Sequence, residues 1–245
     1  MFKSGNGVTP KSKESKAFMV CLILGILCVL AGSFGGGLFF LIIVLLLYYR
    51  QAARRRKFDR IISNAIVLDT ETTGLSSEGK DELLEVSIID LGGNVLFNHY
   101  VKPEHRKTWS KASEINGITP EMVKNEEPIS SYLDELNRIF RDASCVIGYN
   151  TEFDLGFLRV AGVDCSKPYV DVMKDYGVFS GVYDSYHGHE RYFKLSAAAS
   201  HFGYDWGSTS AHDSLADAMA TSFVFNSLRD KGYYKTHGST VIRSL

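Results

Sequence analysis

The sequence has only four cysteines in 245 residues, and their positions argue against two common uses of cysteine. Cys21 and Cys28 lie in an apolar segment, while Cys145 and Cys165 have no CxxC spacing and no neighbouring histidine cluster. Disulfide scaffolds are typical of short secreted chains with many cysteines, and zinc sites need closely spaced cysteine or histidine ligands. The sequence therefore predicts neither a disulfide framework nor a zinc centre.

Residues 58–245 also lack an excess of positive charge. Of the chain's 27 basic and 28 acidic residues, nine and one lie in residues 1–57, which leaves 18 basic and 27 acidic residues in the rest. A domain that holds nucleic acid by bulk charge usually has a basic face, and this acidic segment does not predict one. Bound divalent cations can reverse the sign of a local site, so nucleic-acid chemistry is not excluded.

Charge is absent altogether from residues 17–49, a run of 33 positions. A membrane-spanning helix needs about 20 apolar residues, whereas the apolar part of a signal peptide covers about 7–15 and ends at a cleavage site. The run ends instead near Arg54-Arg55-Arg56-Lys57, which is typical of a stop-transfer flank. The segment therefore predicts a transmembrane anchor and a lipid membrane as partner.

The same segment is compatible with one long span or with a helical hairpin. Glycines cluster at 32–37 and favour a turn, and the flanks 17–31 and 38–49 are short for complete spans. Both outer ends carry Lys or Arg, which are enriched on the cytoplasmic side. We favour the hairpin. In either topology we expect the basic run 54–57, and the domain that follows it, on the cytoplasmic side of the membrane.

Hydrophobic patterning after the anchor predicts an α/β domain with a mixed sheet. Residues 61–68 read as a buried strand, and strands at 83–91 and 94–101 are joined by Gly92-Gly93, a hairpin signal. Helices and strands then alternate. Helical spacing marks residues 129–140, 151–161, 195–202 and 213–228, and short strands are expected at 145–149 and 169–172.

We accordingly divide the chain into five parts. These are a basic tail (1–16), the transmembrane segment (17–49), a basic juxtamembrane linker (50–61), a catalytic domain (62–230) and a C-terminal tail (231–245).

Acidic residues stand where several of these elements meet. Asp69 and Glu71, at i and i+2 of a strand end, point to one face. Asp154 lies in the first turn of a helix, and Asp217 follows His212 by five positions. Taken singly, each has an ordinary explanation. Asp69 and Glu71 read as a solvated acidic turn, Asp154 as a partner of the helix dipole, and His212 as a surface residue. The set, however, is what two-metal phosphoryl chemistry needs, with hard carboxylate ligands for Mg²⁺ or Mn²⁺ and a histidine to take a proton.

His212 and Asp217 would not share a face of one helix, because five positions turn the chain by about 140° net. They can converge only if His212 lies in the loop before the helix. Residues 207–210, Gly-Ser-Thr-Ser, favour such a loop.

With these residues in place, the sequence resembles the DEDDh 3'→5' exonuclease family over roughly residues 62–229. The first motif, Asp-x-Glu-x-Thr-Gly, is matched from Asp69 to Gly74. The second ends in Asn-x-x-Phe-Asp, matched from Asn150 to Asp154, and the third is His-x-x-x-x-Asp, matched by His212 and Asp217. All five catalytic positions are filled, in family order.

The resemblance implies a ribonuclease H-like fold with a mixed five-stranded sheet flanked by helices, and release of nucleoside 5'-monophosphates from single-stranded 3' ends of DNA or RNA. It implies two divalent ions on Asp69, Glu71, Asp154 and Asp217, with His212 as general base. It also implies substrate contacts from a second set of residues and, since several relatives dimerise, allows a homodimer. That second set is Thr72, Leu75, Asn150 and Phe153.

Two features depart from the family pattern. Asn116 stands where a histidine is common, and the aromatic stretch 176–193 matches no family motif. Its aromatic rings could stack bases or pack under a loop. The competing hypothesis for the whole chain is a membrane-tethered module that binds nucleic acid or protein on an inactive exonuclease fold. The complete set of acids and the histidine argue against that loss of activity.

Overall fold

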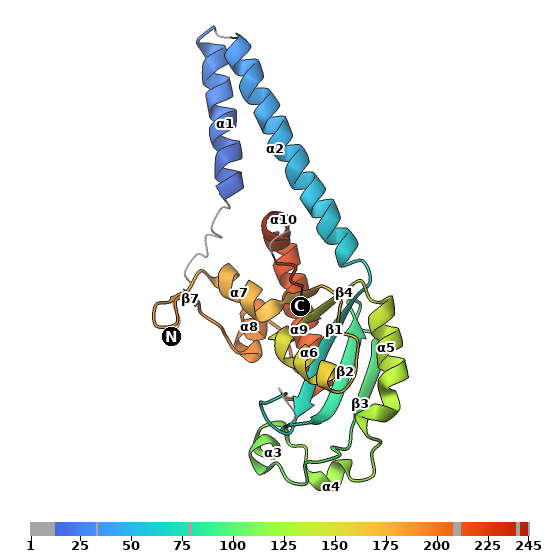
Figure 1. The fold of residues 1–245 in the computed structure, drawn as a ribbon. Helices are drawn as coiled ribbons and strands as arrows, with labels where there is room; N and C mark the ends of the chain where they lie inside the picture. The colour runs from blue at the N-terminus through green and yellow to red at the C-terminus, as the bar shows by residue number, and fades with distance from the viewer. Residues whose placement is uncertain (1–12, 33, 78–79, 208–211, 239–240, 245) are drawn as a thin grey trace.

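The computed structural model describes residues 13–32, 34–77, 80–207, 212–238 and 241–244, and it begins with two long helices (Figure 1). α1 spans Lys13–Leu30 and α2 spans Phe34–Ile61. They form an antiparallel hairpin that projects from one end of the domain (Figure 1). By length and composition alone, α2 is the one described helix that could cross a membrane. Of the expected tail 1–16, residues 1–12 lie outside the described part of the chain.

Residues 50–61, expected to be a linker, instead continue α2 without a break. Alanine and arginine favour helix, and the last turns of α2 are held by packing. Phe58 is only 2% exposed and Ile62, just past the helix, 5% exposed. The ring of Phe58 stacks on that of Tyr234 with centroids 4.9 Å apart. This end of α2 therefore belongs to the domain core.

The five-stranded mixed sheet that we predicted is present. Its order is β3-β2-β1-β4-β5, with β1, β2 and β3 antiparallel and β4 and β5 parallel to β1. The strands are β1 (Ala65–Thr72), β2 (Leu83–Asp90), β3 (Val95–Tyr100), β4 (Cys145–Gly148) and β5 (Tyr169–Asp171). A separate pair, β6 (Tyr183–Asp184) and β7 (His189–Glu190), forms a small hairpin.

Helices cover both faces of the sheet, and the alternation of side chains along β1 divides the core between them. Val67 packs on the side of the long helix α9 (Ser214–Asp230), with Val224 and Phe225. Leu68 packs on the opposite side, with Leu136 of α5 and Leu155 of α6. The helices are α3 (Ser110–Asn116), α4 (Pro120–Val123), the 3-10 turn η1 (Ile129–Tyr132), α5 (Leu133–Asp142), α6 (Thr151–Val160), α7 (Val172–Ser180), α8 (Leu195–Phe202), α9 (Ser214–Asp230) and α10 (Tyr233–His237).

The C-terminal segment, expected to be a tail, packs onto the domain. Tyr234 is 3% exposed, and its hydroxyl donates a hydrogen bond to Asp175 Oδ2 at 3.1 Å. Arg243 exchanges two backbone hydrogen bonds with Tyr169 of β5, both 2.9 Å long. Its guanidinium also lies 3.4 Å from Asp175 Oδ1. The segment thus closes the edge of the sheet.

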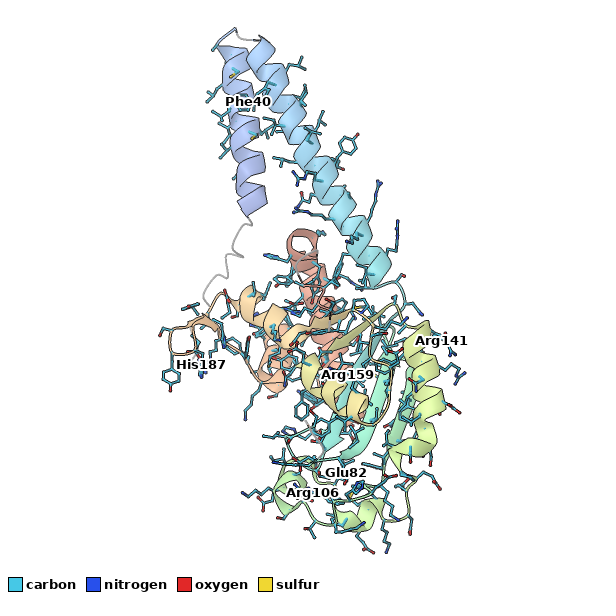
Figure 2. All side chains as sticks on the ribbon, in the orientation of Figure 1. Phe40, Glu82, Arg106, Arg141, Arg159 and His187 are labelled. Atoms are coloured by element: carbon cyan, nitrogen blue, oxygen red, sulfur yellow. The ribbon has the colours of Figure 1, made fainter. Side chains whose placement is uncertain are left out.

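The aromatic stretch 176–193 is divided between the core and the surface. Tyr176 is buried against Phe193 and Phe202, which fits the packing alternative. Tyr183 and Tyr186 are 62% and 89% exposed on the β6–β7 hairpin, which extends to the side of the domain near His187 (Figure 2).

Candidate active site

The carboxyl end of β1 carries the first two acids of the site. Asp69 and Glu71 follow Ala65 and Val67 on the face that packs against α9, because alternate strand residues share a face. β4 runs parallel to β1 with Val67 opposite Ile147, so both strands end at one edge. Ligands of open α/β sheets bind beyond such carboxyl ends.

Asp154 reaches the same edge from the first turn of α6, the helix that follows β4. Its side chain is 3% exposed. Thr70, between the two acids of β1 and facing the other side of the strand, donates a hydrogen bond from Oγ1 to Asp154 Oδ1 at 2.8 Å. A residue of β1 therefore fixes a carboxylate that lies 84 positions later in the chain.

Asp217 and His212 come together at the start of α9, with His212 in the loop before the helix. Asp213 caps the helix, accepting a hydrogen bond from Ala216 N at 2.9 Å. His212 precedes it in the left-handed region, with φ of 74°. That turn lets its backbone N–H donate to Asp217 Oδ2 at 3.2 Å.

The predicted site residues converge on one cavity. Ligand atoms of Glu71, His212 and Asp217 all lie within 4.8 Å of one another. The cavity has a volume of about 590 Å³, and eight of the nine predicted residues line it: Asp69, Glu71, Thr72, Leu75, Phe153, Asp154, His212 and Asp217. The ninth, Asn150, is outside the lining. It is exposed at the start of α6 with φ of 69°.

Burial and mutual repulsion raise the pKa values of these acids. Burial raises the pKa of Asp69 well above its ordinary value, and the charges of Asp154 and Asp217 add to the effect. Burial likewise raises the pKa of Glu71 to about 8, that of Asp154 to about 7 and that of Asp217 to about 6. Lys111 is the single lysine or arginine among the described residues that line the cavity. Bound cations would therefore stabilise the ionised form of these four carboxylates.

Apolar side chains form part of the cavity rim. Leu75 is 88% exposed and Ile115, on α3, is 62% exposed, although both line the cavity. Exposed aliphatic side chains at a concave site commonly mark a binding surface. Phe153 also lines the cavity, and its ring packs on that of Phe157 with centroids 5.0 Å apart.

The loop after β1 is pinned by Asp81. Its Oδ1 accepts a hydrogen bond from Arg106 Nη2 at 2.8 Å, and its Oδ2 accepts one from Ser76 N at 3.0 Å. A Cβ added at Gly74 would lie 2.5 Å from that carboxylate, so a larger residue there would displace Asp81. Arg106 and Glu82 mark this end of the domain in Figure 2, opposite the helical hairpin.

Sequence reasoning missed several residues of the site. Tyr149 lines the cavity and donates from its hydroxyl to Phe193 O at 2.7 Å. Asn116, noted only as a departure, donates from Nδ2 to Thr72 O at 3.3 Å, and hydrogen bonding by its side chain offsets part of the rise in the pKa of Glu71. Glu85, which the sequence offers as a weaker similarity to the family, is 4% exposed on β2 opposite Glu71 and lies outside the cavity lining.

Residues 66–225 match the family model described as Exonuclease. The chain belongs to this exonuclease family. The matched exonuclease domain includes every acid of the cavity as well as His212.

Similar curated proteins agree with the exonuclease assignment. The chain is 37% identical over 116 residues to the DNA polymerase III PolC-type of Thermotoga maritima, covering 44% of this chain and 8% of that protein. It is 32% identical over 98 residues to RNA exonuclease 4 of Xenopus laevis, covering 40% and 23%. The chain thus spans only a small part of the length of these relatives.

Solved structures share the exonuclease fold. Exonuclease X in complex with 5' overhanging duplex DNA superposes with a TM-score of 0.50 at 17% identity, covering 69% of this chain and 93% of that one. A full-length 3'-exonuclease gives a TM-score of 0.53, also at 17% identity, covering 69% and 60%. At this identity the likeness concerns the fold alone.

Proposed function

We propose that the chain is a metal-dependent 3'→5' exonuclease that removes nucleoside 5'-monophosphates from the 3' ends of single-stranded DNA or RNA. The observation that carries the proposal is the convergence of Asp69, Glu71, Asp154, Asp217 and His212 on one cavity of the exonuclease domain.

The donor set fits divalent cations. Four carboxylates share the site, and Asp217 Oδ1 is buried without a hydrogen-bond partner. Carboxylate oxygens of Glu71 and Asp217 lie within 4.8 Å of each other, close enough to share one ion. Carboxylate oxygens suit Mg²⁺ or Mn²⁺, and we assign two such ions to the four acids. When bound, the ions would supply the positive charge that in-line displacement needs at the attacking and leaving oxygens.

His212 is the proposed general base. Its left-handed backbone places it outside the first turn of α9, and its side chain is exposed at the cavity. The ring nitrogen of a neutral imidazole can accept the proton of an attacking water. Asp217, which accepts the His212 backbone N–H, fixes the base relative to the acids.

The terminal nucleotide is the proposed occupant of the cavity. Leu75 and Phe153 offer apolar contact to its base and sugar, and the backbone around Thr72 offers polar groups. Asn150 contributes by turning the chain from β4 into α6, its backbone N–H donating to Asp171 Oδ1 at 3.2 Å. A volume of about 590 Å³ lies within the range of small-ligand sites.

We further propose that residues 17–49 attach the enzyme to a lipid membrane with the exonuclease domain on the cytoplasmic side. An uncharged hairpin flanked by Lys and Arg supports this placement. A homodimer, as in several members of the family, belongs to the same proposal and is tested by the mass of the purified protein in detergent.

The test of the nuclease is hydrolysis of 5'-labelled single-stranded DNA and RNA by the full chain in detergent, with Mg²⁺ or Mn²⁺. We expect a ladder that shortens from the 3' end and disappears with EDTA or His212→Ala. His187→Ala, which changes an exposed histidine of the β6–β7 hairpin, is the matched control and keeps the activity. Binding without cleavage by the folded, metal-loaded protein would favour the inactive binding module instead.

A further inference from the structure

The α1–α2 hairpin presents apolar side chains on all sides. Exposed apolar side chains stand at consecutive positions of both helices, and consecutive positions lie on different faces of a helix. Examples are Leu22, Ile23 and Leu24 of α1 and Leu41 and Ile42 of α2. Side chains without nitrogen or oxygen surround Phe40 near the tip, while nitrogen-tipped side chains begin lower on α2 (Figure 2). Such a surface fits lipid, and the basic flanks fit an anionic bilayer face.

The two helices pack closely on each other near the turn. A Cβ at Gly25 would lie 3.2 Å from Phe40 Cβ, and one at Gly37 would lie 2.4 Å from Val29 Cγ2. Gly32, with φ of 78°, helps to reverse the chain between them. Close packing through glycines is a common way for helices to associate in lipid. The segment is therefore a hairpin and not one long helix.

The uncharged part of each arm is shorter than the hydrocarbon core of a bilayer, although α2 together with its charged end is long and apolar enough to cross one. The uncharged part of α1, residues 17–30, is 14 residues long, or about 21 Å at a rise of about 1.5 Å per residue. The uncharged part of α2, residues 34–49, is 16 residues long, or about 24 Å. The hydrocarbon core is roughly 30 Å thick. Tyr48 and Tyr49 end the apolar part of α2, directly before Arg50, as interfacial residues do.

Beyond Arg50 the helix continues as a stalk. Residues 50–61 add about 18 Å of helix. Phe58 at its end is stacked on Tyr234, and a Cβ at Gly238 would lie 2.9 Å from Phe58 Cγ. The stalk is thus fixed to the domain, whose cavity lies near α3 at the end opposite the hairpin (Figure 1).

We infer that residues 17–49 form a re-entrant hairpin that enters the bilayer from one face and returns to it without crossing. Both basic flanks lie at that face, and α2 holds the exonuclease domain away from the lipid with its cavity turned outward. The inference rests on the membrane attachment proposed above and is independent of the nuclease chemistry.

Single cysteines in the full chain test this topology. Cys21→Ala and Cys28→Ala remove the hairpin thiols, while Cys145 and Cys165 stay because both are buried and burial raises their thiol pKa values to about 12. Probes are then placed in the N-terminal tail (Ser4→Cys), at the turn (Ala31→Cys) and on the stalk (Ala53→Cys). Each is treated with a membrane-impermeant maleimide in right-side-out and inverted vesicles.

We expect Ser4→Cys and Ala53→Cys to react from the same side, and Ala31→Cys to react from neither side until detergent is added. Reaction of Ala31→Cys from the opposite side would show two complete spans. Reaction of Ser4→Cys and Ala53→Cys from opposite sides would show one span. Either result overturns the re-entrant hairpin while leaving membrane attachment intact.

Protein that is released by alkaline washing, or that forms a soluble oligomer without lipid, would contradict membrane attachment itself. The nuclease assay on the same preparations reports separately on the active site. Protease protection of an N-terminal tag in both kinds of vesicle repeats the topology test without any cysteine change. We expect the tag to be cleaved only on the side that exposes the domain.

Discussion

Glu85 of β2 accepts a hydrogen bond at Oε2 from the backbone N–H of Ser214, the first residue of α9, at 3.2 Å. The hydroxyl of the fully buried Ser214 also lies 2.6 Å from that of Ser87, two residues along the strand. Together these contacts dock the start of α9 on the sheet. His212 precedes this anchor by two residues and Asp217 follows it by three, so Glu85 positions both without lining the cavity.

Replacing Glu85 should therefore weaken catalysis from outside the site. In Glu85→Leu the buried Ser214 N–H loses its partner, which costs about 1–3 kcal/mol. We expect a lower melting temperature, and a kcat that falls more than KM rises because His212 is misplaced. Glu85→Gln keeps an oxygen acceptor and should retain most of both. Equal activity of the Leu and Gln variants would show that this anchor does not matter.

Metal binding should depend on pH, because the ligand carboxylates must lose protons to bind a cation. Burial raises the pKa of Asp217 to about 6, of Asp154 to about 7 and of Glu71 to about 8. We expect Mg²⁺ or Mn²⁺ to raise the melting temperature of the full chain more at pH 8.5 than at pH 6. Asp154→Asn with Asp217→Asn should abolish the shift. A shift of equal size at both pH values would contradict the prediction.

Thr70 lowers the pKa of one of these acids, Asp154. Its hydrogen bond to Asp154 Oδ1 favours the ionised carboxylate and holds the pKa of Asp154 below the value that burial alone would give. Thr70→Val, nearly equal in shape, should raise that pKa further. The acid limb of the pH–activity profile should then move to higher pH, with activity recovered by raising the pH. Thr108→Val, which changes an exposed threonine outside the cavity, serves as the comparison and should leave the limb in place.

The end of α2 should contribute directly to the stability of the domain. Phe58→Ala removes a buried ring stacked on Tyr234 and should lower the free energy of unfolding by about 3–5 kcal/mol. Thermal unfolding in detergent measures the change. Arg56→Ala, an exposed stalk position, is the control and should have little effect. If Phe58→Ala left the melting temperature unchanged, α2 would be attached only by the chain.

Asp175 should make the stability fall as pH rises. Burial raises its pKa from near 3.8 to about 7, although Arg243 and Tyr234 partly offset the rise. Between those values the folded protein keeps a proton that the unfolded chain has lost, so the free energy of unfolding decreases from about pH 4 to pH 7. Asp175→Asn should make this slope shallower in melts with EDTA, whereas Asp230→Asn on the surface should not.

Much of the fold was accessible from local patterns. The glycine pair 92–93 predicted the β2–β3 connection, and Gly93 adopts φ of 86° there. The i, i+2 spacing of Asp69 and Glu71 predicted their common face. The 140° offset between His212 and Asp217 predicted that the histidine lies before the helix. In each case a rule that acts within a few residues decided the geometry.

The remaining features depend on partners far away in the chain. Thr70 and Asp154 are 84 positions apart, and Glu85 and Ser214 are 129 apart, so no local pattern links them. α10 has only five residues, too few for a periodic signal, and the C-terminal segment therefore read as a tail. The basic composition of 50–61 likewise hid a helix in which Phe58 alone among these residues is buried, with Ile62 buried just beyond its end.

The left-handed backbone conformation of His212 lowers the stability of the fold, while the proposed catalysis needs its side chain. A side chain other than glycine in this region costs about 1–3 kcal/mol of strain, which glycine would relieve. Selection for heat resistance alone would therefore favour glycine at position 212, and each such variant would lose the proposed base. A directed-evolution screen that measures folding stability but not nuclease activity would therefore rank the inactive His212→Gly variant above the parent enzyme.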